Sequence, residues 1–291
     1  MTAEGPPRWL EETLHEDAGF RSLYRADTII HETHTGQQHL VLFENERFGR
    51  MLMLDGAVQL AEADEFIYHE MMAHVPLFAL GAPEHVLIIG GGDGGLAREV
   101  LKHSSVRNVT QVEIDQGVID FSLRHLPAVS AGAYDDPRHE LVIDDGARFV
   151  GDRSDAYDAI LIDSTDPVGP GAVLFTPDFY ADCRAALKSG GVLVTQNGVP
   201  FLQPAELAST MAAFRELFAD SSCYLASTPT YVGGPMAYGW GTGDAALRHT
   251  DLSVLQGRFD AAAMLTRYYT PAVHQGAFAL PPYVGEAAAP D

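Results

Sequence analysis

From residue 85 onward, apolar runs alternate with segments that carry apolar residues at helical spacing. The strand-like runs are HVLIIG, NVTQVEID, HELVID, YDAILID and GGVLVTQN, and helix-like segments such as LAREVLKH and GVIDFSLRHL lie between several of them. Strands that are apolar along nearly their whole length are typical of a parallel sheet covered by helices on both faces. The pattern therefore predicts an α/β domain. After residue 220, SCYLASTPTYVGGPMAYGWGTGD predicts paired strands added to its sheet.

The first part of the chain has a different pattern. Between residues 21 and 62, short β-branched or apolar runs are separated by glycine, asparagine and charged turns, which predicts β-structure. From Asp64 the segment DEFIYHEMMAHVPL has apolar residues at helical spacing, and Pro76 predicts a kink or an end to this helix. We therefore predict an N-terminal β-rich domain over residues 1–75 and a larger α/β domain over residues 76–291.

Carboxylates follow four successive strands of the predicted sheet. Ligands of open α/β sheets bind beyond the carboxyl ends of the strands, so a site is expected at these positions. The acidic strand ends are Asp93 in the loop GGGDGG, Glu113-Ile114-Asp115, Asp144-Asp145-Gly146 and Asp163-Ser164-Thr165-Asp166. Like charges gathered on one edge repel and raise each other's pKa. The cluster therefore favours a cationic small-molecule ligand over a merely solvated edge.

The glycine loop after the first strand has the spacing of a nucleotide-binding loop. Gly90, Gly92 and Gly95 fit the pattern G-x-G-x-x-G. Glu113 lies 21 residues after Gly92 (113 − 92), where an acid accepts hydrogen bonds from a ribose. Asp93 argues against NAD, because its carboxylate would face the pyrophosphate. A positively charged adenosyl sulfonium fits better. The alternative for Glu113 is a helix cap or a surface acid.

Asp145-Gly146, in the segment VIDDGARFV, has two interpretations. Asp145 is placed to accept a hydrogen bond from an adenine amino group, while Gly146 lets the flat base approach the backbone. The same residue types are typical of a turn or of a helix N-cap before ARFV. Both interpretations stay open at the level of the sequence.

Two motifs that suggest other chemistry are set aside. His69 and His74 resemble the histidines of a zinc-protease helix, but they are five residues apart rather than four. At about 100° per residue their side chains point some 140° from each other, so we predict no metal site. Ser164 lacks a G-x-S-x-G setting and an obvious base, which argues against a nucleophilic serine.

The charge and cysteine content narrow the classes of partner. Eighteen basic and forty acidic residues among 291 give a formal net charge of −22. This argues against a nucleic-acid or anionic membrane partner, and fits either solubility or attraction of a cationic ligand. No signal peptide and no apolar run long enough to span a bilayer are visible.

Cys183 lies in a predicted helix with Thr176 as N-cap and Gly190 as its stop. We expect a packed thiol and a reducing cytoplasm.

The order of the motifs resembles one enzyme family. The segments GGGDGG, VEID, DDG, DSTDPVGP and PTYVGG, with DGAVQLAEADEFIYHEMMAHVPL and RYYTPAVHQGAFALPPY, are similar to those of the polyamine aminopropyltransferases, specifically the bacterial spermidine synthases. The resemblance covers nearly the whole chain. It implies a small N-terminal β-domain and a Rossmann-like, methyltransferase-type parallel sheet. It also implies transfer of an aminopropyl group from decarboxylated S-adenosylmethionine to a diamine such as putrescine, giving spermidine, 5′-methylthioadenosine and a proton.

The resemblance implies roles for individual residues. Asp163 resembles the catalytic base, and Asp93 would hold the ammonium of the aminopropyl group. Trp9 would form an apolar wall for the methylenes of the diamine. The segment from Asp163 to Asp166, with Pro170, resembles a mobile loop that closes over the site. The residues implied to bind the donor are Gln38, Glu113, Asp145, Gly146 and Pro170. The residues implied to line the amine channel are Gln59, Tyr68, His69, Asp93, Asp163, Ser164, Thr165, Asp166 and Tyr231.

The chain departs from the family's pattern at three places. Ala63 stands where an arginine or lysine is common, and His39 stands where an aspartate is common. Ala172-Val173 replaces an acidic or small polar pair in the implied closing loop. The first two could change surface pairing, and the third could change loop order or amine preference. None of them removes a carboxylate that the chemistry requires.

The resemblance implies no metal and no redox cofactor, and small-molecule partners in a homodimer or homotetramer. Two alternatives stay open. One is an S-adenosylmethionine-dependent methyltransferase that uses the same sheet and ribose acid. The other is a polyamine-binding protein without catalysis, against which Asp163 and the complete loop to Pro170 argue.

Overall fold

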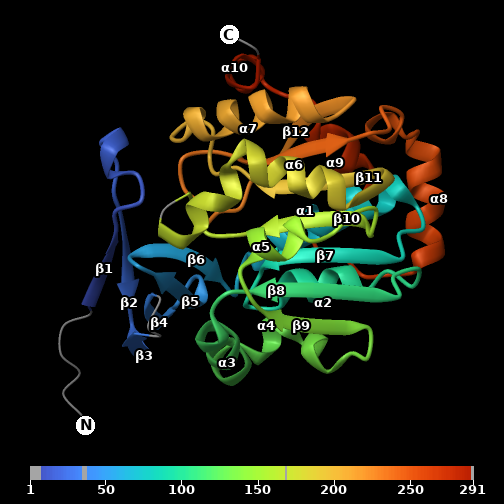
Figure 1. Cartoon of the computed structure of the whole chain (residues 1–291). Helices are drawn as coiled ribbons and strands as arrows, with labels where there is room; N and C mark the ends of the chain where they lie inside the picture. Colours follow the sequence, from blue (N-terminus) through green and yellow to red (C-terminus); the bar gives the residue numbers. More distant parts are fainter. Residues whose placement is uncertain (1–7, 35–37, 168, 290–291) are drawn as a thin grey trace.

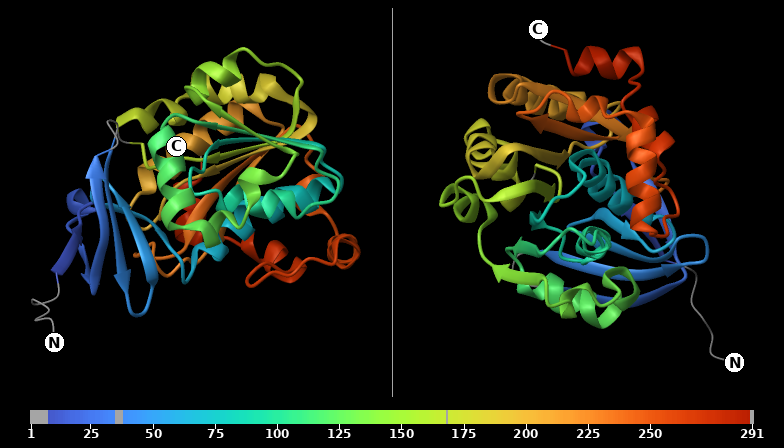
Figure 2. Two further views of the ribbon diagram at one scale, coloured as in Figure 1. Left: turned by 90° about the horizontal axis from the view of Figure 1, so that it is seen from below. Right: turned by 90° about the vertical axis from the view of Figure 1, so that its right-hand side faces the viewer.

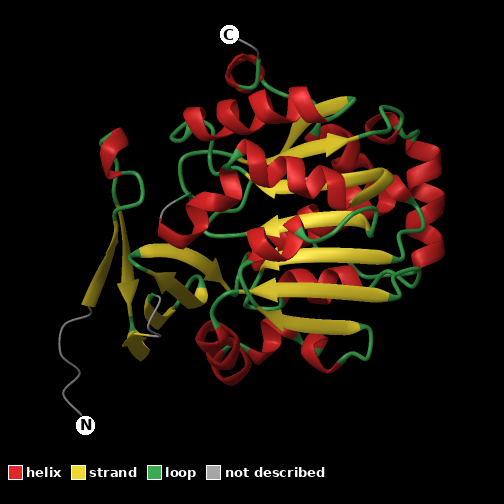
Figure 3. Ribbon diagram, in the orientation of Figure 1, coloured by secondary structure: helices red, strands yellow, loops and turns green. Residues whose placement is uncertain are grey.

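The computed structural model describes residues 8–34, 38–167 and 169–289, without the side chains of residues 169 and 170. A small β part lies beside a larger α/β part (Figures 1 and 3). The small part is a two-stranded hairpin and a four-stranded antiparallel sheet. Its elements are β1 (Arg8–Glu12), the 3-10 helix η1 (Glu16–Ala18), β2 (Ser22–Ala26), β3 (Thr28–His34), β4 (His39–Asn45), β5 (Gly49–Leu54) and β6 (Ala57–Ala61).

The larger part is built on a seven-stranded sheet with the strand order β12-β13-β11-β10-β7-β8-β9. The strands from β11 to β9 in this order run parallel, and β13 pairs antiparallel with β11 and β12. The predicted α/β fold with an added strand pair is therefore confirmed. The strands are β7 (His85–Gly90), β8 (Asn108–Glu113), β9 (His139–Ile143), β10 (Tyr157–Asp163), β11 (Leu187–Gln196), β12 (Asp220–Ala226) and β13 (Met236–Thr242).

Helices cover both faces of this sheet (Figure 2). Successive residues of β7 explain why both faces are apolar: Val86 and Ile88 join the core under α1 and α2, whereas Leu87 and Ile89 join the core under α6 and α7. In the described part of the chain, no helix is both long and apolar enough to cross a membrane. The helices are α1 (Glu65–Leu80), α2 (Gly95–Leu101), α3 (Gln116–His125), α4 (Pro127–Ser130), η2 (Ala133–Asp135), α5 (Gly146–Gly151), η3 (Gly169–Phe175), α6 (Pro177–Ala186), α7 (Pro204–Leu217), η4 (Leu247–His249), α8 (Leu252–Ala262), α9 (Pro271–Ala277) and α10 (Pro282–Ala287).

Pro76 was predicted to mark a kink or an end of this helix. Helix α1 runs through Pro76 to Leu80, so the alternative of an end is wrong, and the kink stays a prediction. Proline removes one backbone donor from a helix, but α1 is buried on almost every side. Packing against the sheet, α2 and α8 therefore outweighs the local cost. The boundary predicted near residue 75 falls inside this helix, while the last strand of the small sheet ends at Ala61.

Two other sequence expectations differ from the structure. The side chain of Thr176 caps α6 as predicted, but the helix ends at Ala186 rather than at Gly190. Gly190 lies inside β11 with a φ of +77°, because the apolar residues beyond Ala186 pair with β10. Strand β1 precedes the region predicted as β-structure. Cys183 is fully buried in the core under α6, as predicted.

Candidate active site

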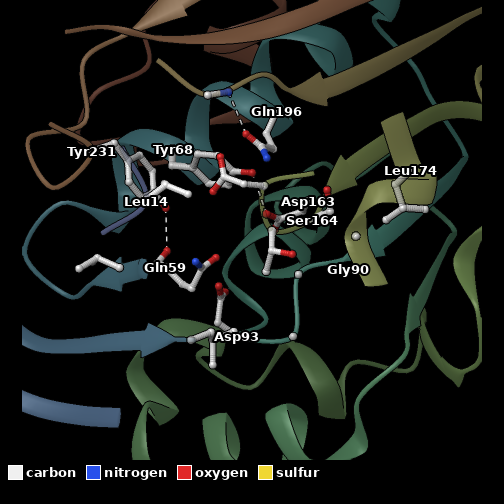
Figure 4. A pocket seen from close by; sticks show the side chains of 18 of the residues that line it. Leu14, Gln59, Tyr68, Gly90, Asp93, Asp163, Ser164, Leu174, Gln196 and Tyr231 are labelled. Atoms are coloured by element: carbon white, nitrogen blue, oxygen red, sulfur yellow. Dashed lines mark hydrogen bonds between the residues drawn. The ribbon is translucent and has the colours of Figure 1, made fainter. Parts of the chain in front are cut away.

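A pocket lies at the carboxyl ends of β7, β8 and β10 and extends to the small β part (Figure 4). The structure brings together the acids predicted at the strand ends, which lie up to 73 residues apart (166 − 93), because parallel strands end at one edge of the sheet. Their roles toward a ligand stay predictions. The predicted site residues in its lining are Gln38, Gln59, Tyr68, His69, Asp93, Glu113, Asp145, Gly146, Asp163, Ser164, Thr165, Asp166 and Tyr231.

Gly90 and Gly91 hold the end of β7 against the end of β10. Gly90 has a φ of +88°, and a Cβ there would lie 2.0 Å from the carbonyl oxygen of Asp163. The N–H of Gly91 donates to the same carbonyl at 2.8 Å. A side chain at Gly90 would push the strand ends apart, so glycine is required to keep Asp163 beside the loop that carries Asp93.

His69 lies between two carboxylates beside this loop. Its Nδ1 lies 2.6 Å from Oε2 of Glu65, and its Nε2 lies 3.5 Å from Oδ1 of Asp93. Arg98 donates to both oxygens of Glu65, at 3.2 and 2.9 Å. Burial lowers the pKa of His69, but the charges and hydrogen bonds of Asp93 and Glu65 outweigh it and raise the pKa to about 10. The ring is therefore an imidazolium at neutral pH.

Asp93 faces the pocket as an ionised carboxylate. Burial acts to raise its pKa, but His69, the N–H of Gly95 and Arg98 together hold the pKa below its ordinary value. The N–H of Gly95 donates to Oδ1 of Asp93 at 2.6 Å. A Cβ at Gly95 would lie 2.3 Å from Cε1 of His69, so this glycine leaves room for the ring that neutralises Asp93.

Asp163 has one oxygen held by the protein and one without a partner. The hydroxyl of Tyr68 donates to Oδ1 at 2.7 Å. Oδ2 is buried and has no hydrogen-bond partner among the described residues. Burial, and then the charge of Asp93, raise the pKa of Asp163 from 3.8 to about 6. A carboxyl with this pKa is mostly ionised at pH 7 and can still accept a proton.

Glu113 lines the pocket at the end of β8. It is only 9% exposed, so the alternative of a surface acid is wrong. Its Oε1 accepts the N–H of Asp115 at 2.9 Å, and it is Asp115 rather than Glu113 that caps α3. Burial raises the pKa of Glu113 to about 7. A Cβ at Gly92 would lie 3.1 Å from its Oε2, so this glycine gives the carboxylate its space.

Asp145 is the N-cap of α5, and its Oδ1 accepts the N–H groups of Ala147 and Arg148 at 2.8 and 3.2 Å. The N-cap interpretation is therefore confirmed. Asp145 and Gly146 also line the pocket, so contact with an adenine stays a prediction. A Cβ at Gly146 would lie 2.4 Å from Cγ2 of Ile89, which explains the glycine by packing alone.

The loop after β10 and the small β part close the other end of the pocket. Asp166 accepts a hydrogen bond through Oδ1 from Nε2 of Gln203 at 2.7 Å. The hydroxyl of Ser164 is buried and has no hydrogen-bond partner among the described residues. Tyr231 donates to the carbonyl oxygen of Gln59 at 2.7 Å, which joins the segment before β13 to β6 (Figure 4).

The structure places Trp9 outside the pocket, which corrects the expectation that it forms an apolar wall for a diamine. In β1, Leu10 and Glu12 are buried, while Trp9 faces the opposite way and is 57% exposed. Trp9 instead lines a shallow hollow beside β2. Pro170 lies in η3, but its side chain lies outside the described residues.

Several lining residues were not predicted. Glu12 comes from the hairpin, where its two oxygens accept the N–H of Val58 at 2.8 Å and the hydroxyl of Ser22 at 2.6 Å. The pattern of apolar residues predicted no strand at β1, so the sequence did not identify Glu12 as a site residue. Gln196 is the last residue of β11, so the rule that ligands bind at the carboxyl ends of the strands could have identified it. Gln203 precedes Pro204 at the start of α7.

The two histidines of α1 have separate surroundings. His74 lies 3.0 Å from Oε2 of Glu99 and 3.0 Å from Nε2 of His103, in the core between α1 and α2. His69 faces the pocket instead. In the segments that the structure describes, no group of three or more His, Cys, Asp or Glu side chains could hold a metal ion.

The three departures from the family's pattern differ in their distance from the pocket. The imidazole Nε2 of His39 lies 3.3 Å from Oε1 of Glu32 on the neighbouring strand. The N–H of Ala63 donates to the carbonyl of Phe48. Both contacts lie within the small β part, whereas Val173 lines the pocket.

Two family models together match the chain from residue 8 to residue 251, apart from residues 63 and 64. Residues 65–251 match the model described as the spermine/spermidine synthase domain, and residues 8–62 match the spermidine synthase tetramerisation domain. The first match contains the strands and loops that build most of the pocket. The second contains the hairpin and the small sheet.

Curated relatives and solved structures agree with these models. The chain is 55% identical to the polyamine aminopropyltransferase of Ruegeria sp. (strain TM1040) over 95% of this chain and 96% of that protein. It is 53% identical to polyamine aminopropyltransferase 1 of Pseudomonas aeruginosa, with the same coverage. A spermidine synthase in complex with the transition state analogue AdoDATO aligns with a TM-score of 0.92 and 35% identity over 99% of this chain and 98% of that one. Spermidine synthase from Thermotoga maritima aligns with a TM-score of 0.89 and 33% identity, covering 99% and 97% of the two chains. With its fold, its acidic pocket and these matches, the chain belongs to the spermidine synthase family of polyamine aminopropyltransferases.

Proposed function

We propose that this chain transfers the aminopropyl group of decarboxylated S-adenosylmethionine to putrescine, giving spermidine and 5′-methylthioadenosine. The observation that carries the proposal is the charge of the pocket. No lysine or arginine is present among the described residues that line it. Because both substrates are cations, such a pocket attracts each of them and disfavours phosphate-bearing ligands. The lining carboxylates are Glu12, Asp93, Glu113, Asp145, Asp163 and Asp166.

The donor occupies the side of the pocket formed by β7, β8 and α5. Glu113, at the end of β8, accepts hydrogen bonds from the two ribose hydroxyls. Asp145 and Gly146 border the adenine. Gln38, from the small β part, contacts the methylthioadenosine moiety of the donor. Asp93 binds the ammonium of the aminopropyl group, because it is ionised and faces the pocket.

The acceptor amine reacts at Asp163. One amine of putrescine gives its proton to the free Oδ2 of Asp163 and then attacks the aminopropyl carbon that is bonded to sulfur. A nitrogen–carbon bond forms as the carbon–sulfur bond breaks, and its electron pair returns to sulfur, which becomes a neutral thioether. The remote ammonium lies at Asp166, with Tyr68 and Tyr231 along the methylenes. Holding nitrogen, carbon and sulfur in line supplies much of the acceleration.

Product analysis with each sulfonium donor tests this proposal. The chain is incubated with putrescine and either decarboxylated S-adenosylmethionine or S-adenosylmethionine, and the products are separated by mass. We expect spermidine and 5′-methylthioadenosine in equal amounts from the decarboxylated donor. S-adenosylhomocysteine from the intact donor would instead support a methyltransferase. Binding of both cations without any product would support a polyamine-binding protein.

We further propose a homodimer or homotetramer in the cytoplasm. The match of residues 8–62 to a tetramerisation domain supports an oligomer built on the small β part. Cys183 and Cys223 are both free and buried, which fits a reducing compartment. Light scattering after size exclusion measures the assembly directly, and a monomer at micromolar concentration would contradict it.

A further inference from the structure

A row of alternating charges leads from the pocket into the interface between α1 and α2. Asp93 lines the pocket, and Nε2 of His69 lies 3.5 Å from its Oδ1. Nδ1 of His69 lies 2.6 Å from Oε2 of Glu65, one turn earlier on α1. Arg98 on α2 donates to Oε2 of Glu65 at 2.9 Å and to Oε1 of Glu99 at 2.7 Å. The charge of a side chain in the pocket therefore depends on groups that lie behind it.

Glu65 is fixed by its surroundings. Residues four apart lie on the same face of a helix, so α1 brings Glu65 against His69. Arg98 donates to both oxygens of this carboxylate and also to the carbonyl oxygen of Val129. Burial acts to raise the pKa of Glu65, but His69 and then Arg98 hold the pKa below its ordinary value. Glu65 therefore presents a buried carboxylate to Nδ1 at neutral pH.

The ring of His69 has a carboxylate at each nitrogen, so the doubly protonated form, which donates from both, fits this place. The positive ring in turn acts on Asp163: Asp93 raises the pKa of Asp163, and His69 lowers it. The imidazolium therefore favours the ionised form of Asp163, which is the form that accepts a proton. The titratable and charged groups around the ring are Glu65 and Tyr68 of α1, Asp93 of the glycine loop and Asp163 at the end of β10, with Arg98 of α2 behind Glu65.

We propose that Glu65 is a positioning residue for the aminopropyl transfer, because it holds the second proton on His69 and so keeps Asp163 ionised as the solution becomes more acidic. Arg98 holds Glu65 in place for this role. The inference rests on the proposed function, because it takes Asp163 as the proton acceptor from it.

The pH dependence of the rate separates this role from a structural one. Glu65→Gln removes the charge beside Nδ1 and keeps the length of the side chain, while Arg98 keeps its pair with Glu99. Without the imidazolium, Asp163 binds a proton more readily, so the acidic limb of kcat/KM for the decarboxylated donor should move upward by about one pH unit. At pH 9 Asp163 is ionised in both proteins, and kcat/KM should stay within about twofold of the parent. The loss of a distant negative charge alone would move the limb downward.

The matched control is Glu84→Gln, because Glu84 also pairs with an arginine, Arg107, but at the exposed surface. Its pH profile should match that of the parent. A double-variant cycle shows whether Glu65 acts through the ring. His69→Gln should move the acidic limb upward at least as far as Glu65→Gln does, and adding Glu65→Gln to it should cause no further upward shift.

Nitrogen NMR of the histidine rings measures the proton without any turnover, with the signal of His69 assigned by its loss in His69→Gln. Both nitrogens of this ring should be protonated at pH 8 in the parent, whereas the ring in Glu65→Gln should lose a proton at or below this pH. A neutral ring in the parent would overturn the inference, even if Glu65→Gln folds poorly. So would an acidic limb that stays in place or moves downward in Glu65→Gln, or an equal upward shift in the His69→Gln background. Spermidine formation by the parent chain tests the proposed function separately, so the two failures are distinguishable.

Discussion

Tyr68 and Asp163 form a hydrogen bond of 2.7 Å that joins α1 to the end of β10. The bond uses one carboxylate oxygen and leaves the other, which is buried, without a partner in the described part of the chain. Tyr68 thereby orients Asp163 without neutralising it. This relationship places a proton acceptor at the meeting point of the donor and acceptor sides of the pocket, and the first two predictions depend on it.

Asp163→Asn should lower turnover by roughly 10²–10⁴-fold, the usual contribution of a positioned proton acceptor. The affinity for the donor should stay nearly unchanged, because Asp93 and Glu113 make the proposed contacts with the donor. Single-turnover rates and titration of the donor measure the two quantities. Asp152→Asn, at an exposed position, is the matched control. Turnover within a few-fold of the parent would remove Asp163 from the role of base.

The same substitution should stabilise the fold at high pH. The folded-state pKa of Asp163, about 6, lies above the ordinary value of 3.8, so the buried charge destabilises the fold progressively as pH rises from about 4 to above 6. A rise from 3.8 to about 6 corresponds to roughly 3 kcal/mol, all of it present at pH 8. Asp163→Asn should therefore raise Tm at pH 8 and have little effect at pH 4. Thermal unfolding at the two pH values measures this, and an equal shift at both would contradict it.

Asp93→Asn should weaken binding of decarboxylated S-adenosylmethionine while weakening S-adenosylmethionine less or even improving it. The intact donor carries a carboxylate beside its amino group, and the ionised Asp93 repels that carboxylate. Two unit charges about 4 Å apart interact by about 4 kcal/mol at an effective dielectric of 20, and even half of that is more than a tenfold preference. Calorimetric titration of both ligands decides; equal losses would leave Asp93 as a structural turn residue.

Putrescine should be the best acceptor, cadaverine slower and spermidine poor. A dication anchored at Asp166 reacts only if its free amine reaches the donor carbon beside Asp163, so the length between the two amines sets the rate. The values of kcat/KM for the three amines measure this. Val173 borders the pocket at a position that departs from the family's pattern. A higher kcat/KM with spermidine than with putrescine would overturn the prediction.

Gly95→Ala should damage both stability and donor binding. The new Cβ would lie 2.3 Å from Cε1 of His69 and would push the ring away from Asp93, at a cost of about 1–3 kcal/mol. Gly257→Ala is the control, because its Cβ meets nothing within 4 Å and alanine favours a helix interior by about 0.5–1 kcal/mol. Urea unfolding and donor titration should show a loss for the first variant and a gain in stability alone for the second.

The sequence determined the α/β fold and the set of acids at its edge. In a parallel sheet every strand delivers its carboxyl end to the same edge, so position along the chain predicts position in space. Asp93, Glu113, Asp145 and Asp163 each follow an apolar strand, and the structure brings all four into one pocket. No knowledge of side-chain contacts was needed for this.

The tertiary structure decided what depends on contacts between distant segments. Trp9 and Glu12 lie on opposite faces of a hairpin strand, and only the pairing of β1 with β2 and its packing on the small sheet set which of them faces the pocket. Helix α1 continues through Pro76 because burial outweighs the lost backbone bond. Gln203 donates to both Asp166 and Glu206, which joins residues up to 40 positions apart (206 − 166). Such contacts arise from loop geometry and packing. Neither follows from the periodic pattern of apolar residues that predicts strands and helices.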